Sequence, residues 1–260
     1  MNKLLLSTLF LAQTLFAGLT ADQIIDKAEN RDDGDNRIAN MTMIMVDKNK
    51  KQRIRQMKTF SKDFGDDIYQ TIFFLAPSDV KNTAFLTYDY DDTKKDDDQW
   101  LYLPALKKTK RIASSDKSGS FMGSDFTYSD MTKPNPQDYS YTIAKESQVG
   151  EHKVWVIVRT PIDEKIVNET GYVQSYIFVR QDNFVVIRAL HILKDRSKKK
   201  YMEVKKLEKI DGIWTSLEIE MKTVKNKKRL HSTILRFDEV KYNQDLQPDF
   251  FKVRTIEKGL

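Results

Sequence analysis

The sequence contains no cysteine among its 260 residues. This absence excludes disulfide bonds, a thiolate nucleophile, thiolate metal ligands and the cysteine that carries a bacterial lipid anchor. A chain of more than about 200 residues can still be stable, because it buries most of the surface that it exposes when unfolded. We therefore expect a fold that is stabilised by core packing and carries no lipid anchor.

Histidine is scarce, and the familiar catalytic motifs are absent. His152, His191 and His231 lie far apart in the chain, and none has a partner at metal-ligand spacing. The sequence has no P-loop, GxSxG, HExxH or dinucleotide-binding motif. The acidic stretch 89–98 lacks the central glycine and the closing glutamate of an EF-hand, so we interpret it as a solvated turn. We expect no metal site, no cofactor, no catalytic residues and no enzymatic activity; a lipid hydrolase is the weaker alternative.

Only one long apolar run is present, Leu4–Phe16. It follows a single lysine and precedes the small residue Ala17, which is the layout of a secretory signal peptide. The run is shorter than the roughly 20 residues that cross a bilayer, which argues against a transmembrane anchor. We expect residues 1–17 to be a signal peptide and residues 18–260 to form one domain, exported as a soluble protein to the periplasm.

Charge of both signs is abundant, and the net charge is +6. The basic residues gather in four clusters, which are Lys48–Arg55, Lys107–Arg111, Lys194–Lys200 and Lys222–Arg229. For an exported protein, such clusters favour transient contact with anionic lipid headgroups or an acidic partner over nucleic acid. The alternative, that each cluster is a solvated turn between strands, stays open.

The hydrophobic pattern predicts one short helix followed by many strands. Thr20–Arg31 has a capping threonine and apolar residues at helical spacing. From residue 36 onward the apolar residues recur with a period of two, which is typical of β-strands. Short turns separate these strands, so we expect an antiparallel meander of about eleven or more strands. A sheet that wide has to curl, which predicts a mainly β fold shaped as a curled sheet or incomplete barrel.

Large apolar side chains recur at alternating or neighbouring strand positions. These candidate cavity-wall residues are Met41, Met43, Met45, Phe73, Leu75, Leu86, Tyr88, Trp100, Tyr102, Trp155, Ile157, Leu217, Ile219 and Met221. Most apolar stripes form a dry core, and that interpretation stays open here. Methionine is unbranched and polarizable, however, so a methionine-lined surface suits a flexible guest such as an acyl chain. Apolar ligand cavities are common in the mouths of β-barrels.

The loop Ser114–Pro136 is longer than an ordinary connection in a compact domain. It carries the large apolar residues Phe121, Met122 and Phe126 on backbone that contains two glycines. This combination predicts a flexible lid over an apolar cavity. The alternative is that the same side chains plug the barrel.

The run from Phe74 to Tyr128 resembles a known family. It contains FLAPSDVKNTAFLTYDY and then WLYLPALKK, followed by the SFMGSDF segment and a tyrosine. These motifs resemble the LolA-like outer-membrane lipoprotein-sorting proteins, in particular the branch found with RND/MMPL-type exporters. The resemblance extends over the whole of residues 18–260 and implies a half-open antiparallel β-barrel, with helices and loops covering its concave face.

The same resemblance implies a periplasmic carrier. Such a protein shields the acyl chains of a lipoprotein or lipid and transfers them between membranes, with an RND/MMPL-type exporter or permease as its membrane partner. Ser118–Asp130 would be the lid. We expect a monomer. The alternative function is a periplasmic adaptor of such an exporter that has no lipid cargo, with the cavity filled by its own side chains.

Overall fold

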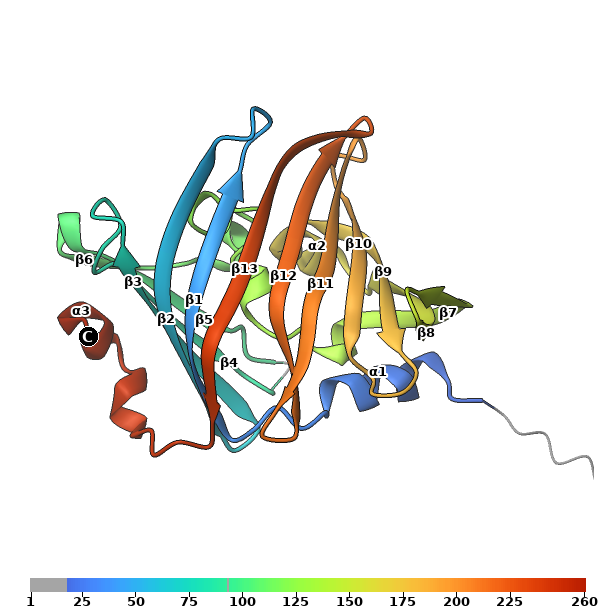
Figure 1. Cartoon of the computed structure of the whole chain (residues 1–260), viewed down its shortest axis with the longest axis horizontal. Coiled ribbons are helices and arrows are strands. Elements are labelled where there is room, and N and C mark those ends of the chain that lie inside the picture. Colours follow the sequence, from blue (N-terminus) through green and yellow to red (C-terminus); the bar gives the residue numbers. More distant parts are fainter. Residues whose placement is uncertain (1–17, 93) are drawn as a thin grey trace, which may run out of the picture.

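The computed structural model describes residues 18–92 and 94–260, and its dominant element is a single antiparallel sheet of thirteen strands (Figure 1). The strands are β1 (Asn36–Val46), β2 (Gln52–Phe64), β3 (Asp67–Ala76), β4 (Ala84–Asp89), β5 (Asp98–Leu103), β6 (Lys108–Arg111), β7 (Tyr139–Val149), β8 (His152–Pro161), β9 (Tyr172–Arg180), β10 (Val186–Leu193), β11 (Lys198–Ile210), β12 (Ile213–Lys225) and β13 (Lys228–Tyr242). The helices are α1 (Ala21–Glu29), α2 (Glu164–Thr170) and α3 (Val253–Lys258).

The strand order shows why the barrel stays open. It runs β6-β5-β4-β3-β2-β1-β13-β12-β11-β10-β9-β8-β7, so β6 and β7 are the two edges. These two strands follow one another in the chain, and the connection between them has to cross the opening of the curled sheet. We call residues 112–138 the crossing segment and the sheet face that it covers the concave face. Figure 1 shows the segment in green behind the central strands.

The helix α1 begins with a capping box. Thr20 accepts a hydrogen bond from the Gln23 amide at 3.2 Å, and the Gln23 side chain accepts one from the Thr20 amide at 3.0 Å. Its apolar side packs Ile24 and Ile25 against Ile157 and other residues of β8–β10. The helix therefore covers the concave face at the β7 end, while the crossing segment covers it at the β6 end.

The outer face is also covered at the β2–β5 end. There Phe251 and Ile256, from the C-terminal turn and α3, pack against Phe60, Phe73 and neighbouring side chains. The Tyr88 hydroxyl donates to the Phe251 carbonyl at 2.7 Å. Because both faces are covered here, β3–β5 can be apolar on both sides.

The fold class predicted from the sequence is confirmed: the chain is mainly β, with a half-open antiparallel sheet and a short N-terminal helix. The described residues form thirteen strands, compared with the predicted figure of about eleven. The helices α2 and α3 were not predicted, because each is short and has too few turns to show a helical period. The expected signal peptide, residues 1–17, lies outside the described residues.

Candidate functional site

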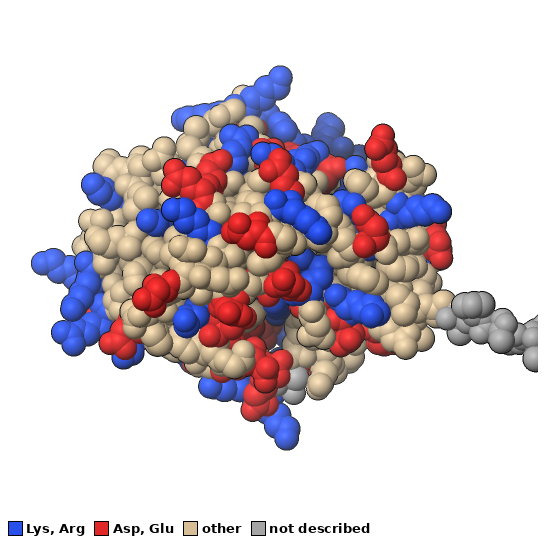
Figure 2. Space-filling model, turned by 60° about the horizontal axis from the view of Figure 1, so that its bottom comes forward, with Lys and Arg blue, Asp and Glu red and all other residues tan. Residues whose placement is uncertain are grey.

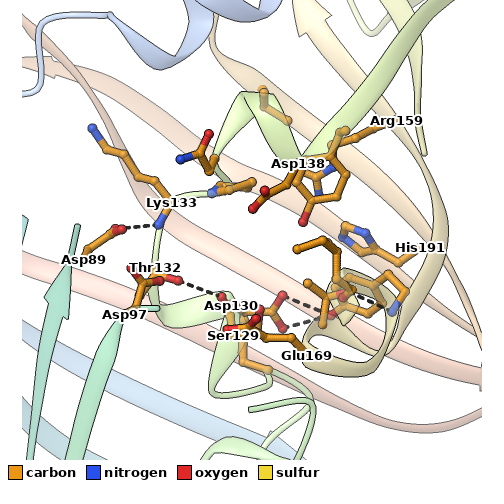
Figure 3. A pocket seen from close by; sticks show the side chains of 18 of the residues that line it. Asp89, Asp97, Ser129, Asp130, Thr132, Lys133, Asp138, Arg159, Glu169 and His191 are labelled. Carbon is orange, nitrogen blue, oxygen red and sulfur yellow. Dashed lines mark hydrogen bonds between the residues drawn. The ribbon is translucent and has the colours of Figure 1, made fainter. Parts of the chain in front are cut away.

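A cavity of about 360 Å³ lies on the concave face between the crossing segment, α2 and the wall formed by β10–β12. We call it the central cavity. Its apolar floor consists of Phe126, Val186, Met202, Ile219 and Met221. Its remaining lining is strongly polar, with acidic residues from the β4–β5 turn, the crossing segment and α2. Figure 3 shows Asp89 and Asp97 on one side of this cavity, with Arg159 and His191 on the other.

Two titratable groups in the central cavity have strongly shifted pKa values. Burial, together with the nearby Asp97 carboxylate, raises the pKa of Asp89 to about 7, although the hydrogen bond from the Lys133 amide opposes this shift. That amide donates to Asp89 at 2.7 Å. Complete burial lowers the pKa of His191 to about 3, so this imidazole is neutral at pH 7. Its Nδ1 lies 2.8 Å from the Ser175 hydroxyl.

Tyr172 lies between the central cavity and a second cavity, and it lines both. Its hydroxyl donates to the Asp130 carboxylate, with oxygen separations of 2.9 and 3.0 Å. The ammonium of Lys200 lies 3.4 Å from the same hydroxyl, and the Tyr172 ring stacks on His191 with a centroid separation of 4.3 Å. This side chain therefore connects the crossing segment to β9–β11 at the partition between the two cavities.

The second cavity has a volume of about 590 Å³ and lies toward the β1–β2 and β12–β13 hairpins. We call it the basic cavity, because its lining includes Lys51, Arg53, Lys198 and Lys200 but only two carboxylate residues, Asp47 and Asp125. Hydroxyl side chains from the crossing segment, β12 and β13 also line it.

Asp125 fixes the crossing segment to the sheet. The carboxylate is buried and accepts hydrogen bonds from the hydroxyls of Thr223 at 2.5 Å and Thr233 at 2.7 Å. It also contacts the imidazole of His231. Its own backbone amide donates to the Thr233 hydroxyl at 2.9 Å. Charge-assisted hydrogen bonds of this kind are stronger than neutral ones, so the segment is firmly attached at this point.

The structure brings one group of the predicted wall residues together on the concave face. The strand register aligns Met41, Met43 and Met45 with Leu235 and its neighbours on β13, which are in turn aligned with β12. The predicted wall residues on this face are Met41, Met43, Met45, Trp155, Ile157, Leu217, Ile219 and Met221. Of these, Ile219 and Met221 line the central cavity and Met45 lines the basic cavity. The others pack against α1 or within the core.

The remaining predicted wall residues lie on the opposite, outer face. They are Phe73, Leu75, Leu86, Tyr88, Trp100 and Tyr102. The prediction that these six residues share a cavity wall with the methionines is therefore wrong. Successive side chains of a strand point to opposite faces, and in β3–β5 it is the neighbours Phe74, Phe85 and Leu101 that lie on the concave side. All but Leu75, which is exposed, belong to the cluster covered by Phe251 and α3.

The predicted lid residues lie in the crossing segment, but two of them belong to the core. Phe121 is completely buried, and its ring centroid lies 5.1 Å from that of Phe85 and 5.6 Å from that of Tyr128. Phe126 is buried too and lines the central cavity. Met122 is partly exposed, and its carbonyl accepts a hydrogen bond from Arg55 at 2.6 Å. In this conformation the segment fills the methionine-rich side of the concave face.

Sequence reasoning missed the polar residues of both cavities, above all Asp125, Asp130, Tyr172 and Lys200. The sequence did contain an indication for Lys200. This lysine is two residues from Met202 on β11, so it lies on the same face of the strand as an apolar side chain. The crossing segment has no period, so no comparable signal marked Asp125 or Asp130.

Within residues 18–92 and 94–260, no group of three or more histidine or carboxylate residues is arranged to hold a metal ion. No helix of that part of the chain is long and apolar enough to span a membrane.

Comparison with known proteins places this architecture. Residues 66–258 match a sequence family described as "Uncharacterized protein". No curated protein matches the chain by sequence. A DUF1329 family protein from Desulfovibrio piger is 28% identical, with a TM-score of 0.82 over 91% of this chain and 97% of the other.

Two further solved structures extend the comparison. A "putative outer membrane lipoprotein-sorting protein domain" from Vibrio parahaemolyticus is 26% identical, with a TM-score of 0.83 over 91% of this chain and 98% of that one. A LolA superfamily protein from Nitrosomonas europaea is 18% identical, with a TM-score of 0.69 over 91% of this chain and 99% of the other chain. At this identity, the similarity supports the fold alone. The resemblance to LolA-like proteins is confirmed: this chain belongs to the family matched by residues 66–258, and its fold is LolA-like.

Proposed function

We propose that this protein is a periplasmic carrier that shields the acyl chains of a lipid or lipoprotein and transfers them between membranes. The observation that carries the proposal is the central cavity, whose floor of Phe126, Val186, Met202, Ile219 and Met221 is apolar while its mouth is polar. This combination suits an amphiphile. The similarity to a lipoprotein-sorting domain of Vibrio parahaemolyticus supports the same conclusion.

The size of the cavity agrees with a partly enclosed chain. Its volume of about 360 Å³ lies within the range of small-molecule sites, roughly 300 to 1,000 Å³. Each methylene removed from water contributes about 0.8 kcal/mol, so six buried methylenes contribute roughly 5 kcal/mol before the costs of binding. The role is non-catalytic, because a carrier needs burial and release and makes or breaks no covalent bond.

A basic rim supports contact with a membrane surface. The β1–β2, β10–β11 and β12–β13 turns lie at one end of the sheet, where the Asn226 amide donates to the Ser197 carbonyl at 3.1 Å (Figure 1). Residues 47–53, 194–198 and 225–229 together contain eleven Lys or Arg and two Asp. Figure 2 shows a different face, on which acidic and basic side chains are interspersed. Anionic headgroups would hold this end near the membrane.

The proposal includes export by the N-terminal signal and action as a monomer. Its membrane partner is an exporter or permease of the RND/MMPL type, to which the carrier docks while its cargo passes on. Release then requires an acceptor at least as apolar as the central cavity.

The test reduces the volume of the central cavity by placing a larger side chain in its floor. Ile219→Trp places a large side chain in the floor of the central cavity, whereas Leu75→Trp places the same side chain on the exposed outer face. We expect the first variant to lose at least tenfold in affinity for a fluorescent fatty-acid probe, and the second to bind like the unmodified protein. Circular dichroism melting curves check that both variants fold.

Native mass spectrometry of the protein purified from its own envelope provides the independent measurement. Co-purified lipid is the expected result. Protein that carries no lipid and binds no probe would overturn the carrier function.

A second function is favoured by one specific observation. Phe121 and Phe126 already fill the methionine-rich side of the concave face, as expected of an adaptor whose cavity is occupied by its own side chains. Lipid-free protein that co-purifies with an RND/MMPL-type exporter would favour the adaptor over the carrier.

A further inference from the structure

Lys200 presents a buried positive charge to the basic cavity. The side chain is 8% exposed and lines the cavity from β11. Within the described part of the chain, no carboxylate lies within 4.0 Å of its ammonium group, and its one hydrogen-bond partner is the Tyr172 hydroxyl at 3.4 Å. A buried ammonium without a direct counter-charge is unfavourable, and this burial lowers the pKa of Lys200.

The nearest acidic groups are already engaged. Asp130 accepts a hydrogen bond from the Tyr172 hydroxyl, whose oxygen lies 2.9 and 3.0 Å from the two carboxylate oxygens, and another from the Thr127 amide at 2.7 Å. Asp125 is held by the two threonine hydroxyls of β12 and β13 and by His231. These carboxylates moderate the positive potential around Lys200 and make no direct ion pair with it.

Two further cations in the same cavity have no ion-pair partner among the described residues. Lys51 lies in the turn before β2, and Arg53 lies on β2 with its side chain on the concave face. The cavity is also lined by hydroxyl groups, including that of Ser118, whereas the hydroxyls of Ser120 and Ser124 already donate to backbone carbonyls. Ammonium, guanidinium and hydroxyl groups around one space are the donors that bind a carboxylate or phosphate.

The two cavities have opposite electrostatic character. The central cavity is lined by seven carboxylate residues and four Lys or Arg. The basic cavity is lined by four Lys or Arg and two carboxylate residues. An anionic headgroup is therefore disfavoured at the acidic mouth of the central cavity and favoured near Lys200. Tyr172 and Thr170 border both spaces, so a molecule that occupies both lies against this partition.

We propose that the basic cavity binds the carboxylate or phosphate headgroup of an anionic amphiphile, with Lys200 as its counter-charge, while the chain of that amphiphile lies on the apolar floor of the central cavity. The proposal rests on the carrier function and specifies its cargo class. It also fixes the orientation of the cargo, with the headgroup toward the basic rim.

The experiment compares ligands that differ only in their headgroup. Dodecanoate, dodecyl phosphate and dodecanol are titrated into the full protein by isothermal calorimetry at pH 7.4, with inorganic phosphate as the free-anion arm. The variant is Lys200→Met, which removes the buried charge with little change in volume and therefore preserves folding. The control is Lys199→Met at the preceding residue of β11, whose side chain lies on the other face.

The expected result is that the two anionic ligands bind the unmodified protein about tenfold more tightly than dodecanol, as one charged hydrogen-bonded contact provides. This preference should disappear in Lys200→Met and persist in Lys199→Met. Equal binding of all three ligands to the unmodified protein would overturn the headgroup site and leave the carrier function standing. Binding of none would overturn the carrier function itself. If inorganic phosphate binds as tightly as dodecyl phosphate, the basic cavity is a site for a free anion, and the proposal that its ligand is an amphiphile is wrong.

Discussion

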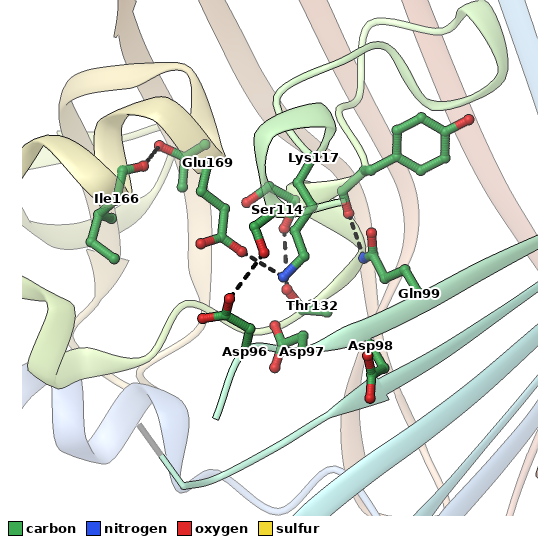
Figure 4. Close-up of polar contacts among 12 residues, drawn as sticks. Asp96, Asp97, Asp98, Gln99, Ser114, Lys117, Thr132, Ile166 and Glu169 are labelled. Carbon is green, nitrogen blue, oxygen red and sulfur yellow. Dashed lines mark hydrogen bonds and ion pairs between the residues drawn. The ribbon is translucent and has the colours of Figure 1, made fainter. Parts of the chain in front are cut away.

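The ammonium group of Lys117 donates to the Glu169 carboxylate at 2.5 Å, joining the crossing segment to α2 (Figure 4). The side chain of Lys117 is 2% exposed and that of Glu169 is 17% exposed. Two segments 52 residues apart in sequence thereby form one cover over the concave face. The two partners differ in burial, which makes their contributions to stability separable.

We predict that Glu169→Gln is more destabilising than Lys117→Met. The first change leaves a fully buried ammonium without its ion-pair partner, at a cost of about 3 kcal/mol, while the second leaves a carboxylate that water can still reach. The double variant Lys117→Met with Glu169→Gln should recover most of the loss. Chemical denaturation measures all three, and Lys110→Met, which removes an exposed ion pair with Asp116, is the matched control. A Glu169→Gln protein as stable as that control would contradict the prediction.

Asp125 should control how readily the crossing segment opens. Asp125→Asn keeps the shape of the side chain and removes the charge that the hydroxyls of Thr223 and Thr233 stabilise. Loss of charged hydrogen bonds costs roughly 1.5 to 3 kcal/mol, so amide hydrogen exchange in residues 118–130 should accelerate about tenfold or more. Exchange in β7 and β8, which do not contact this carboxylate, serves as the internal reference. Equal protection of residues 118–130 in both proteins would show that other contacts hold the segment.

Much of the fold follows from the sequence because alternation of apolar residues is a local property. The period of two in β1, β2 and β12 predicted these strands within a few residues of their observed limits. Alternation alone does not determine which face becomes concave. In β3–β5 both faces are apolar, since Phe251 and α3 cover the outer one, and six predicted wall residues therefore lie on the outer face.

The predicted lid shows a second limit of local reasoning. Gly119 suggested flexibility, but a Cβ atom at this position would lie 2.8 Å from the Asp116 carbonyl oxygen. The glycine therefore permits a close backbone approach inside a tight turn. Phe121 is buried in the core, so Phe121→Asp should destabilise the fold as well as any ligand site. The polar contacts around Asp125, Tyr172 and Lys200 join distant segments, so no local pattern predicted them.

Asp89 should make stability depend on pH in the range from about 4 to 8. Its pKa is raised to about 7 in the folded protein from an ordinary value of 3.8. The folded state therefore holds this proton more tightly than the unfolded state. The contribution of protonated Asp89 to the free energy of unfolding is fully present below pH 3.8 and is lost as the pH rises through 7. The unmodified protein should lose about 2 to 4 kcal/mol of its free energy of unfolding in this way between pH 4 and pH 8. Asp89→Asn has no carboxyl group to ionise, so we predict that this variant is more stable than the unmodified protein at pH 8.

Urea denaturation of both proteins from pH 4 to pH 8 measures this difference. Asp91→Asn is the control, because Asp91 is an exposed carboxyl group of the adjoining turn. Parallel stability curves for the unmodified protein and Asp89→Asn would contradict the assignment to Asp89.

The C-terminal cover of the outer face should be essential for a closed apolar surface. Phe251 is 1% exposed and packs on Phe64, and its carbonyl accepts the Tyr88 hydroxyl at 2.7 Å. Phe251→Ala removes a fully buried ring and should cost about 3 kcal/mol or more, whereas Tyr88→Phe removes one hydrogen bond and should cost about 1 kcal/mol. Binding of an apolar dye should rise in the first variant, because the outer face of β3–β5 becomes exposed. Leu260→Ala, at an exposed position, is the control. If dye binding by Phe251→Ala equals that of the control, the outer face is protected by contacts other than those of Phe251.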